Sequence, residues 1–385
     1  MKIFARVFLG FWLAVIAIVA LTAAAIATSS PFQANRFRNV SVDDVQACAQ
    51  HELELYKTGT KRPLPKAADS CNNGLLIPPD GAVLSEAKLS REDTQLVKEI
   101  KGPAIHIEDV AAFYKLYDAT DGHPTAEQLQ HEYLNPGSTG LHRMAQLRSV
   151  TGARIAEAMA KYPDMYANAQ PCMAVLPAGR TRVAIALHKL AQLYPEAQFP
   201  PVTIAIGRGK PVGVTDAMGV MVGLEALCAV TRLEPNLEDR FVHMIVHEYA
   251  HVQQSIASPT LYNDEKPTIL EQSLIEGAAE FAAELISGSV SSTDLKEITK
   301  GHEKEIETAF VADEDKIDLS KWLYNGTLTK SGDLGYWVGY RIVKSYYENA
   351  SDKRRALREI LDMKDPKELL AKSGWYPGIV LRSKS

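Results

Sequence analysis

Apolar side chains recur at helical spacing over residues 236–252. A chain that turns by roughly 100° per residue gathers such positions on one side of a helix. Asn236 precedes the pattern and Asp239 follows three residues later, which is typical of a helix start. We therefore predict a buried helix here. Its apolar positions are Leu237, Phe241, Met244, Ile245 and Val252.

A second helical pattern begins near Glu271 and continues past Phe281. It contains Gly277 followed by Ala278 and Ala279, and these small residues lead us to expect a close approach to the first helix. Residues 127–161 and 337–372 are also predicted to be helical. The apolar positions of the second pattern are Leu274, Ile275, Ala278, Ala279, Ala282 and Leu285.

Two short runs before the first helix favour β-strands. Val202 to Ile206 and Gly219 to Leu224 are rich in β-branched and other apolar residues, and Gly- and Pro-containing turns separate them. The predicted fold class is therefore α+β, mostly helical, with a small mixed sheet that precedes the first helix.

The first predicted helix carries the sequence His247-Glu248-Tyr249-Ala250-His251, an H-E-x-x-H motif. Side chains at i and i+4 lie roughly 6 Å apart on one helix face, so both imidazoles can converge on one Zn²⁺. Glu248 is rotated by about 100° from His247, toward the open coordination position, where a carboxylate can take a proton from water. We predict a zinc site with Glu248 as general base.

Glu276, on the second predicted helix, is the expected third ligand, and Glu280, one turn later, is expected to accept a hydrogen bond from a ligand histidine. Glu271 and Glu280 are alternative third ligands. Another reading is a solvated stripe, because Glu276, Glu280 and Glu284 recur every four residues. His243 lies one turn before His247 and is expected to be a packed or supporting group, because a helix separates it from His251 by roughly 12 Å.

The pairing of H-E-x-x-H with Glu276-Gly277-Ala278-Ala279-Glu280 resembles the gluzincin class of zinc metallopeptidases. Within that class the chain is similar to a bacterial family of predicted zinc-dependent proteases of unknown physiological role, over roughly residues 100 to 380. The resemblance implies a zincin-like domain, with Glu276 as third ligand and Glu280 supporting a histidine. Further matching segments are Tyr194-Pro195, Pro201 to Gly207, Gly223 to Glu225, Gln253-Gln254 and Gly335 to Tyr340.

The same resemblance implies two further features of the site. Tyr336 and Tyr340 are the candidates for a donor that stabilises an oxyanion, although their helical spacing is equally compatible with core positions. In gluzincins, an extended peptide pairs along the strand before the metal helix. Val220, Met221 and Val222 are therefore candidates for the substrate groove, or else for an ordinary sheet interior.

The first residues of the chain predict export. Lys2 and Arg6 precede an uncharged run from Val7 to Ala27, and Ala25-Ile26-Ala27 fits a small-x-small cleavage site. The run also has about the 20 residues that span a bilayer, so residues 1–27 are either a signal peptide or an anchor in the inner membrane. Either reading places the remainder in the periplasm or outside the cell.

Cysteine usage and charge add two limits. Four cysteines in an exported chain favour disulfides. Chain order suggests Cys48–Cys71 and Cys172–Cys228, although four cysteines allow three connectivities. The formal net charge of -5, without a basic stripe, argues against nucleic-acid binding. We expect an N-terminal region over residues 28–100, ending between Leu75 and Gly102, and a metallopeptidase domain over 101–385.

The sequence therefore predicts an exported zinc metallopeptidase that acts on peptides or proteins. Two alternatives share its residues: a hydrolase of a non-peptide amide, and a non-enzymatic, exported or membrane-tethered protein that contains zinc. The intact Glu248 argues against the second, because a purely structural zinc site needs no base at an open position.

Overall fold

The computed structural model describes residues 102–230, 236–288, 293–327 and 332–381, all of which belong to one compact unit. The predictions for residues 1–27, for residues 28–100 and for a Cys48–Cys71 bond lie outside the described residues. Within the described ranges, no helix combines the length and the apolar character needed to cross a membrane.

A four-stranded mixed sheet has the order β1-β2-β4-β3. The pairs β1–β2 and β2–β4 are parallel, whereas β3 and β4 are antiparallel. The predicted strands β2 and β4 are confirmed. Strands β1 and β3 were not predicted, because β1 has only two residues and the Gly-Val-Thr-Asp sequence of β3 has little strand propensity. The strands are β1 Ile105–His106, β2 Val202–Ala205, β3 Gly213–Asp216 and β4 Gly219–Gly223.

Strand β4 lies inside the sheet, which agrees with the alternative of an ordinary sheet interior and not with a substrate groove. Val220, Met221 and Val222 are fully buried between neighbouring strands and the covering helices, so they do not line a groove. The strand at this edge of the sheet is β3, because the chain turns back after Asp216 and inserts β4 between β2 and β3.

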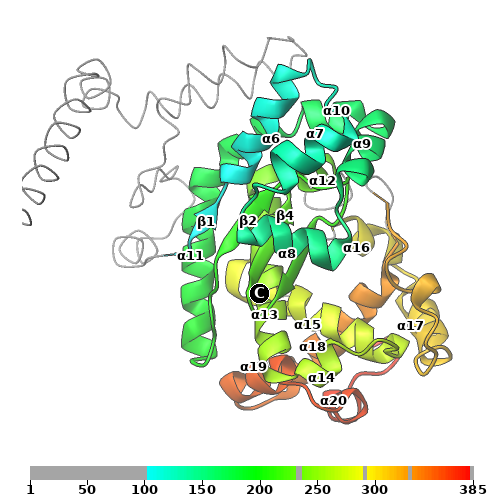
Figure 1. The fold of residues 1–385 in the computed structure, drawn as a ribbon. Coiled ribbons are helices and arrows are strands. Elements are labelled where there is room, and N and C mark those ends of the chain that lie inside the picture. The colour runs from blue at the N-terminus through cyan, green and yellow to red at the C-terminus, as the bar shows by residue number, and fades with distance from the viewer. Residues whose placement is uncertain (1–101, 231–235, 289–292, 328–331, 382–385) are drawn as a thin grey trace, which may run out of the picture. The chain divides into compact units, whose positions relative to one another are not determined.

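Most of the helices before the metal motif gather around one end of the sheet, whereas the helix over residues 139–148 covers one face and the long helix over residues 176–193 runs beside the strands (Figure 1). Several are capped by the residue before them; Ser138, for example, accepts a hydrogen bond from the backbone N–H of Leu141 at the start of α8. These elements are α6 Glu108–Ala119, α7 Ala126–Gln128, the π-helix η2 Leu129–Leu134, α8 Thr139–Arg148, α9 Gly152–Lys161, α10 Pro163–Ala167, the 3₁₀-helix η3 Gln170–Val175, α11 Leu176–Leu193 and α12 Leu224–Ala229.

Helix α13, Leu237–Ala257, is the predicted motif helix, and the Asn236 side chain caps it by accepting from the Asp239 N–H at 3.0 Å. Helix α15, Ile269–Ser287, is the second predicted helix. The predicted α+β class, mostly helical with a small sheet, is confirmed. The remaining elements are α14 Pro259–Tyr262, α16 Thr293–Thr299, α17 Glu303–Val311, η4 Leu319–Lys321, α18 Leu334–Asn349, α19 Lys353–Leu361 and α20 Pro366–Ser373.

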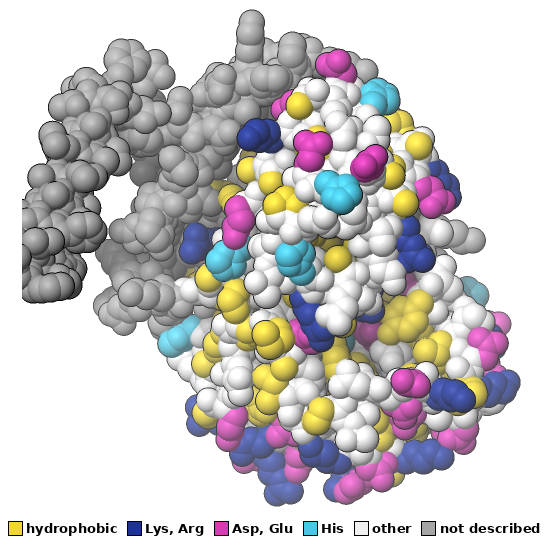
Figure 2. All heavy atoms as spheres, viewed as in Figure 1, with side chains coloured by type: hydrophobic (Ala, Val, Ile, Leu, Met, Phe, Trp, Pro, Cys, Tyr) yellow, Lys and Arg dark blue, Asp and Glu magenta, His cyan; other side chains and the backbone are white. Residues whose placement is uncertain are grey.

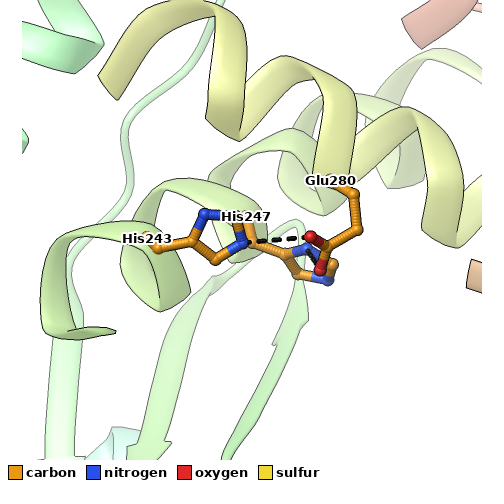
Figure 3. Close-up of side chains that lie close together, drawn as sticks. All are labelled: His243, His247 and Glu280. Atoms are coloured by element: carbon orange, nitrogen blue, oxygen red, sulfur yellow. Dashed lines mark ion pairs between the residues drawn. The ribbon is translucent and has the colours of Figure 1, made fainter. Parts of the chain in front are cut away.

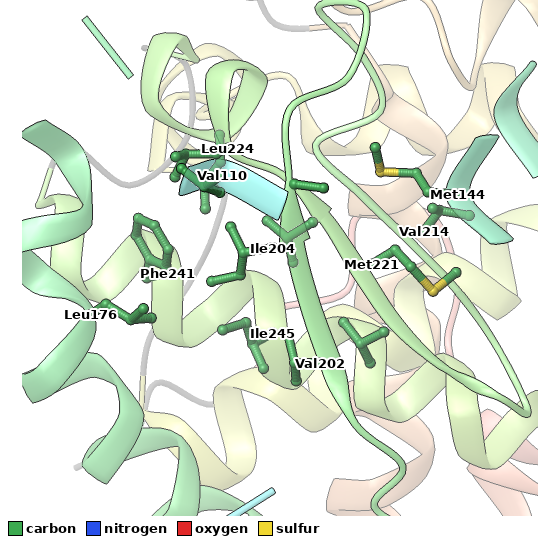
Figure 4. Packing of buried hydrophobic residues seen from close by; sticks show 14 of the residues in the cluster. Val110, Met144, Leu176, Val202, Ile204, Val214, Met221, Leu224, Phe241 and Ile245 are labelled. Atoms are coloured by element: carbon green, nitrogen blue, oxygen red, sulfur yellow. The ribbon is translucent and has the colours of Figure 1, made fainter. Parts of the chain in front are cut away.

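Helices α13 and α8 cover opposite faces of the sheet. Figure 4 shows Phe241 and Ile245 of α13 beside Val202 and Ile204 of β2, whereas Met144 of α8 lies beside Val214 and Met221. Because side chains alternate along each strand, both faces of β2 and β4 are buried, which explains their almost continuous apolar sequence.

Helix α15 packs between α13 and α18, and this corrects the reason for its small residues. A Cβ atom at Gly277 would lie 2.1 Å from the Gly339 carbonyl carbon, so Gly277 permits the approach of α18 rather than α13. Ala279 instead belongs to the core shared with α13. Helix α15 thus has two close neighbours, α13 and α18. Its sequence pattern does not show which small residue faces which neighbour.

A disulfide joins Cys172 of η3 to Cys228 of α12, the pairing expected from chain order. It links two elements that lie 56 residues apart in sequence, beside the sheet.

Candidate metal centre

Three buried side chains converge at the contact of α13 and α15. The Nε2 atoms of His247 and His251 lie 3.0 Å apart. The Oε2 atom of Glu276 lies 3.1 Å from His251 Nε2 and 3.5 Å from His247 Nε2. The structure thus brings together the three residues predicted as metal ligands.

This triangle fits a zinc ion. Tetrahedral zinc with bonds of about 2.0–2.1 Å places neighbouring donor atoms about 3.3 Å apart, and the three observed separations bracket that value. The donor set, two imidazole nitrogens and one carboxylate oxygen, is the one that catalytic zinc sites use. His247, His251 and Glu276 would therefore hold the ion.

Glu280 lies between two imidazoles, as Figure 3 shows. Its Oε1 is 3.1 Å from His247 Nδ1, and its Oε2 is 3.3 Å from His243 Nε2. Burial alone would raise the pKa of Glu280, but the two imidazoles outweigh it and hold the pKa well below its usual range. With the Glu280 carboxylate beside Nδ1, His247 Nε2 faces Glu276. That Glu280 supports a ligand histidine stays a prediction.

His243, His247 and Glu280 also form a second group whose potential ligand atoms lie close together. It shares His247 with the first group, through the other ring nitrogen. His243 is buried on α13 and contacts Glu280 rather than Glu276, so it supports the carboxylate that supports His247.

Gln254 performs the equivalent role for His251. Its amide N–H donates to the Ile275 carbonyl at 2.9 Å, so its oxygen is free to accept from His251 Nδ1 at 2.6 Å. Nε2 of His251 is thereby left to face Glu276. In the sequence, Gln254 stands out only as part of a matching segment, because its role depends on a carbonyl of the other helix.

The other oxygen of Glu276 has partners of its own. Its Oε1 accepts from Gln272 Nε2 at 3.2 Å and from the Tyr324 hydroxyl at 3.0 Å. Burial would raise the pKa of Glu276, but the neighbouring imidazoles of His251 and His247 lower it. Glu271, the alternative ligand, instead accepts from the Thr268 backbone N–H at the start of α15, so it is not at the centre.

Glu248 is buried beside the triangle and faces the edge strand. A Cβ atom at Gly213 of β3 would lie 2.3 Å from Glu248 Oε1, so glycine is needed there for the carboxylate to fit. Burial raises the pKa of Glu248, and the charges of His251 and His247 oppose this rise. A carboxylate with a raised pKa is suited to take up and release a proton.

The two predicted tyrosines lie in different surroundings. The Tyr340 hydroxyl donates to Glu284 and accepts from Lys344 Nζ at 2.7 Å, so the structure does not bring it to the triangle. Tyr336 is nearer, because its ring packs edge-on against Tyr324, with centroids 6.3 Å apart. Burial raises its pKa, and the charge of Glu276 adds to the effect.

Tyr324, which touches Glu276 directly, was missed by the sequence analysis. It lies in the loop between η4 and α18, where no hydrophobic period or motif marks it. Its φ of 58°, rare for a residue with a side chain, is visible only in the structure.

A protein family described as predicted Zn-dependent protease matches residues 209–367. The matched segment is less than half of the chain, but it contains α13, α15, α18 and all the residues of the triangle. No curated protein and no solved structure matches the chain. The chain is therefore similar to a family of predicted zinc proteases, while its place among the gluzincins stays a prediction.

Proposed function

We propose that this protein is a zinc-dependent peptidase. His247, His251 and Glu276 hold the ion, and Glu248 is the general base. The observation that carries the proposal is the buried triangle of donor atoms. A second buried carboxylate, Glu248, lies next to the triangle without being one of its three donors. A structural zinc site uses four protein ligands, whereas three ligands and a neighbouring base are typical of hydrolysis.

Bound zinc supplies Lewis-acid chemistry, which activates water and polarises a carbonyl group. Glu248 takes a proton from the attacking water and later gives it to the leaving amine. Its burial raises its pKa, so the carboxylate binds the proton more readily than an exposed one. Glu280 and Gln254 hold the two histidine rings in fixed orientations while this occurs.

Tyr324 is the proposed donor to the developing oxyanion. Its hydroxyl lies 3.0 Å from Glu276 Oε1, the oxygen outside the donor triangle, and so stands at the margin of that triangle. A neutral O–H is required for this role. Desolvation of the hydroxyl beside Glu276, followed by the charge of Glu276, raises the pKa of Tyr324, although the residue as a whole is 60% exposed. Tyr336 packs against the Tyr324 ring and positions it.

The outer edge of β3 is the proposed binding place for the peptide backbone. In the described sheet β3 has a partner only on the β4 side, so its outer N–H and C=O groups can pair with an extended substrate. Gly213 of β3 lies against Glu248. A peptide paired there would pass the general base.

The experiment is a comparison of wild type, Glu248→Gln and Glu276→Ala as full-length proteins. We expect about one zinc per chain by mass spectrometry in wild type and in Glu248→Gln, and loss of zinc in Glu276→Ala. A fluorogenic peptide library should show kcat reduced by roughly 10²–10⁴ in Glu248→Gln.

Each outcome is informative. Full activity in Glu248→Gln would refute its role as base, and a wild type without zinc after reconstitution would refute the metal centre. Bound zinc without cleavage of any peptide would favour the zinc-containing binding protein or the hydrolase of a non-peptide amide.

We also propose that the catalytic unit works outside the cytoplasm, exported or anchored by residues 1–27. The basic start and the uncharged run from Val7 to Ala27 support this. Fractionation of cells that express a C-terminally tagged chain tests it, and recovery of the protein in the cytosol would contradict it.

A further inference from the structure

Three arginines cluster around the turn that ends α8. Arg208 Nε donates to the Arg148 carbonyl at 3.0 Å, and Arg154 Nη1 donates to the Ser149 carbonyl at 3.0 Å. Ser149 has a φ of 50°, so the chain turns sharply at this point and brings α9 back beside α8. Within the described ranges, no ion pair joins any of the three guanidinium groups to a carboxylate, although other arginines have such pairs.

The cluster lies at the same end of the sheet as Glu248, as the pairing of the strands shows. Arg143 of α8 pairs with Asp216 at the end of β3, and Arg148 lies five residues further along the same helix. Strand β3 runs back from Asp216 to Gly213, which lies against Glu248. Arg208 follows the end of β2, where Ala205 pairs with Gly223, and Gly213 pairs with the neighbouring Val222. Arg208 and the Arg148 carbonyl that it contacts therefore lie at the end of β3 where the proposed general base is found.

The three arginines also act on one another through their charges. Burial lowers the pKa of Arg208, and the charges of Arg154 and Arg148 lower it further. The three guanidinium groups thus repel one another.

A buried carboxylate anchors the loop that carries Arg208. The fully buried Glu225 accepts hydrogen bonds from the backbone N–H groups of Gly207 and Gly209, each at 2.9 Å. Arg208 lies between these two anchor points. Figure 2 shows Lys and Arg side chains beside a hollow in the surface near α8.

We propose that Arg148, Arg154 and Arg208 form a subsite that binds a carboxylate of the peptide substrate. The inference rests on the proposed peptidase function and names its substrate class: peptides with an acidic side chain or a free C-terminal carboxylate close to the scissile bond. A carboxylate here would relieve the repulsion within the cluster and make charge-assisted hydrogen bonds with the planar guanidinium groups.

The first readout is hydrolysis. Peptides that match in sequence but carry Glu or Gln, and a free or amidated C-terminus, separate the two sources of the carboxylate. We expect kcat/KM to favour one carboxylate-bearing series by about tenfold or more, mainly through KM. Arg148→Ala should remove most of that preference, because it slows the carboxylate-bearing peptides more than the neutral ones, while the zinc content stays close to wild type.

Two further variants sharpen the comparison. Arg148→Lys should restore part of the preference, because the charge returns without the planar fork. Arg355→Ala, an exposed arginine of α19 that pairs with Glu359, is the matched control and should change nothing. A wild type without preference, or an Arg148→Ala variant that slows acidic and neutral peptides equally, would overturn the subsite.

The second readout does not need turnover. Fluorescence anisotropy measures the binding of the same labelled peptides to the Glu248→Gln variant, with and without Arg148→Ala. Tighter binding of the carboxylate-bearing peptide, lost in Arg148→Ala, supports the subsite even if hydrolysis fails. Equal binding of all peptides contradicts the subsite while leaving the metal centre intact.

Discussion

Tyr324 has a backbone conformation that is rare for residues with a side chain, and hydrogen bonds fix the residue that follows it. The Asp333 side chain accepts from the Asn325 N–H at 3.0 Å, and the Asp333 N–H donates to the Asn325 side chain at 2.7 Å. A residue at φ 58° persists only where its surroundings over-determine it, and such residues gather at functional sites. The loop thus holds the Tyr324 hydroxyl against Glu276.

The first residue-scale prediction compares two tyrosines. Tyr324→Phe should lower kcat by about 10²–10³, the range for loss of one oxyanion donor, without loss of zinc. Tyr340→Phe is the matched control, because that hydroxyl is bound to Glu284 and Lys344, and its kcat should stay close to wild type. Steady-state kinetics on one fluorogenic peptide checks both. A reversed order of the two variants would return the role to Tyr340.

The second residue-scale prediction concerns Glu280, whose carboxylate contacts His243 and His247. Glu280→Ala should weaken zinc binding by about 10- to 100-fold, because His247 loses the partner on Nδ1 but keeps Nε2 for the metal. Competition with a chromogenic chelator measures the affinity. Glu276→Ala should be more severe, since it removes a ligand atom. Equal losses in the two variants would mean that Glu280 is itself a ligand.

Among the elements, α15 determines whether the donor triangle forms. One side carries Glu276 and Glu280 toward α13, and the other contacts α18 backbone to backbone through Gly277 and Gly339. A Cβ atom at Gly339 would lie 1.7 Å from the Ser273 carbonyl oxygen. The distance between α15 and α18 therefore depends on the absence of a side chain there.

Gly339→Ala tests this dependence. Because the clash is with backbone, α15 or α18 must shift, and we expect a loss of about 1–3 kcal/mol in the free energy of unfolding together with weaker zinc binding. Gly179→Ala on α11 is the control, since its Cβ would meet only ordinary contacts at 3.8 Å or more. That variant should be neutral, or more stable by about 0.5–1 kcal/mol. Denaturant titration compares them, and equal stabilities would refute the packing argument.

At the scale of the whole molecule, the centre joins two parts of the hydrophobic core. The larger core cluster contains the sheet and α13, the smaller one contains α18, and α15 contributes residues to both. A metal held by α13 and α15 therefore links the two clusters, and zinc binding should stabilise the whole described unit.

Thermal unfolding measures this linkage. With free zinc at about 100 times Kd, the folded state gains roughly 2.7 kcal/mol, so Tm should rise with zinc and fall when a chelator removes it. Glu276→Ala should show little response to either. A wild type whose Tm is insensitive to zinc would contradict a site built between the two helices.

Much of the fold could be predicted because local patterns determine it. The periods of α13 and α15, the Asn236 cap and the apolar runs of β2 and β4 are all readable from neighbouring residues. The four-residue spacing of His247 and His251 likewise fixes their common face, whichever way the helix packs. For this reason the expected ligand triad also converges in the structure.

Only the tertiary structure decided which strand forms the sheet edge, which helix Gly277 approaches and which tyrosine reaches Glu276. Each depends on contacts between segments distant in sequence: β4 enters between β2 and β3, α18 crosses α15 at Gly339, and the loop after η4 returns to the centre. A local pattern states which side of an element is buried. It does not state which partner buries it, because that depends on how all the elements pack together.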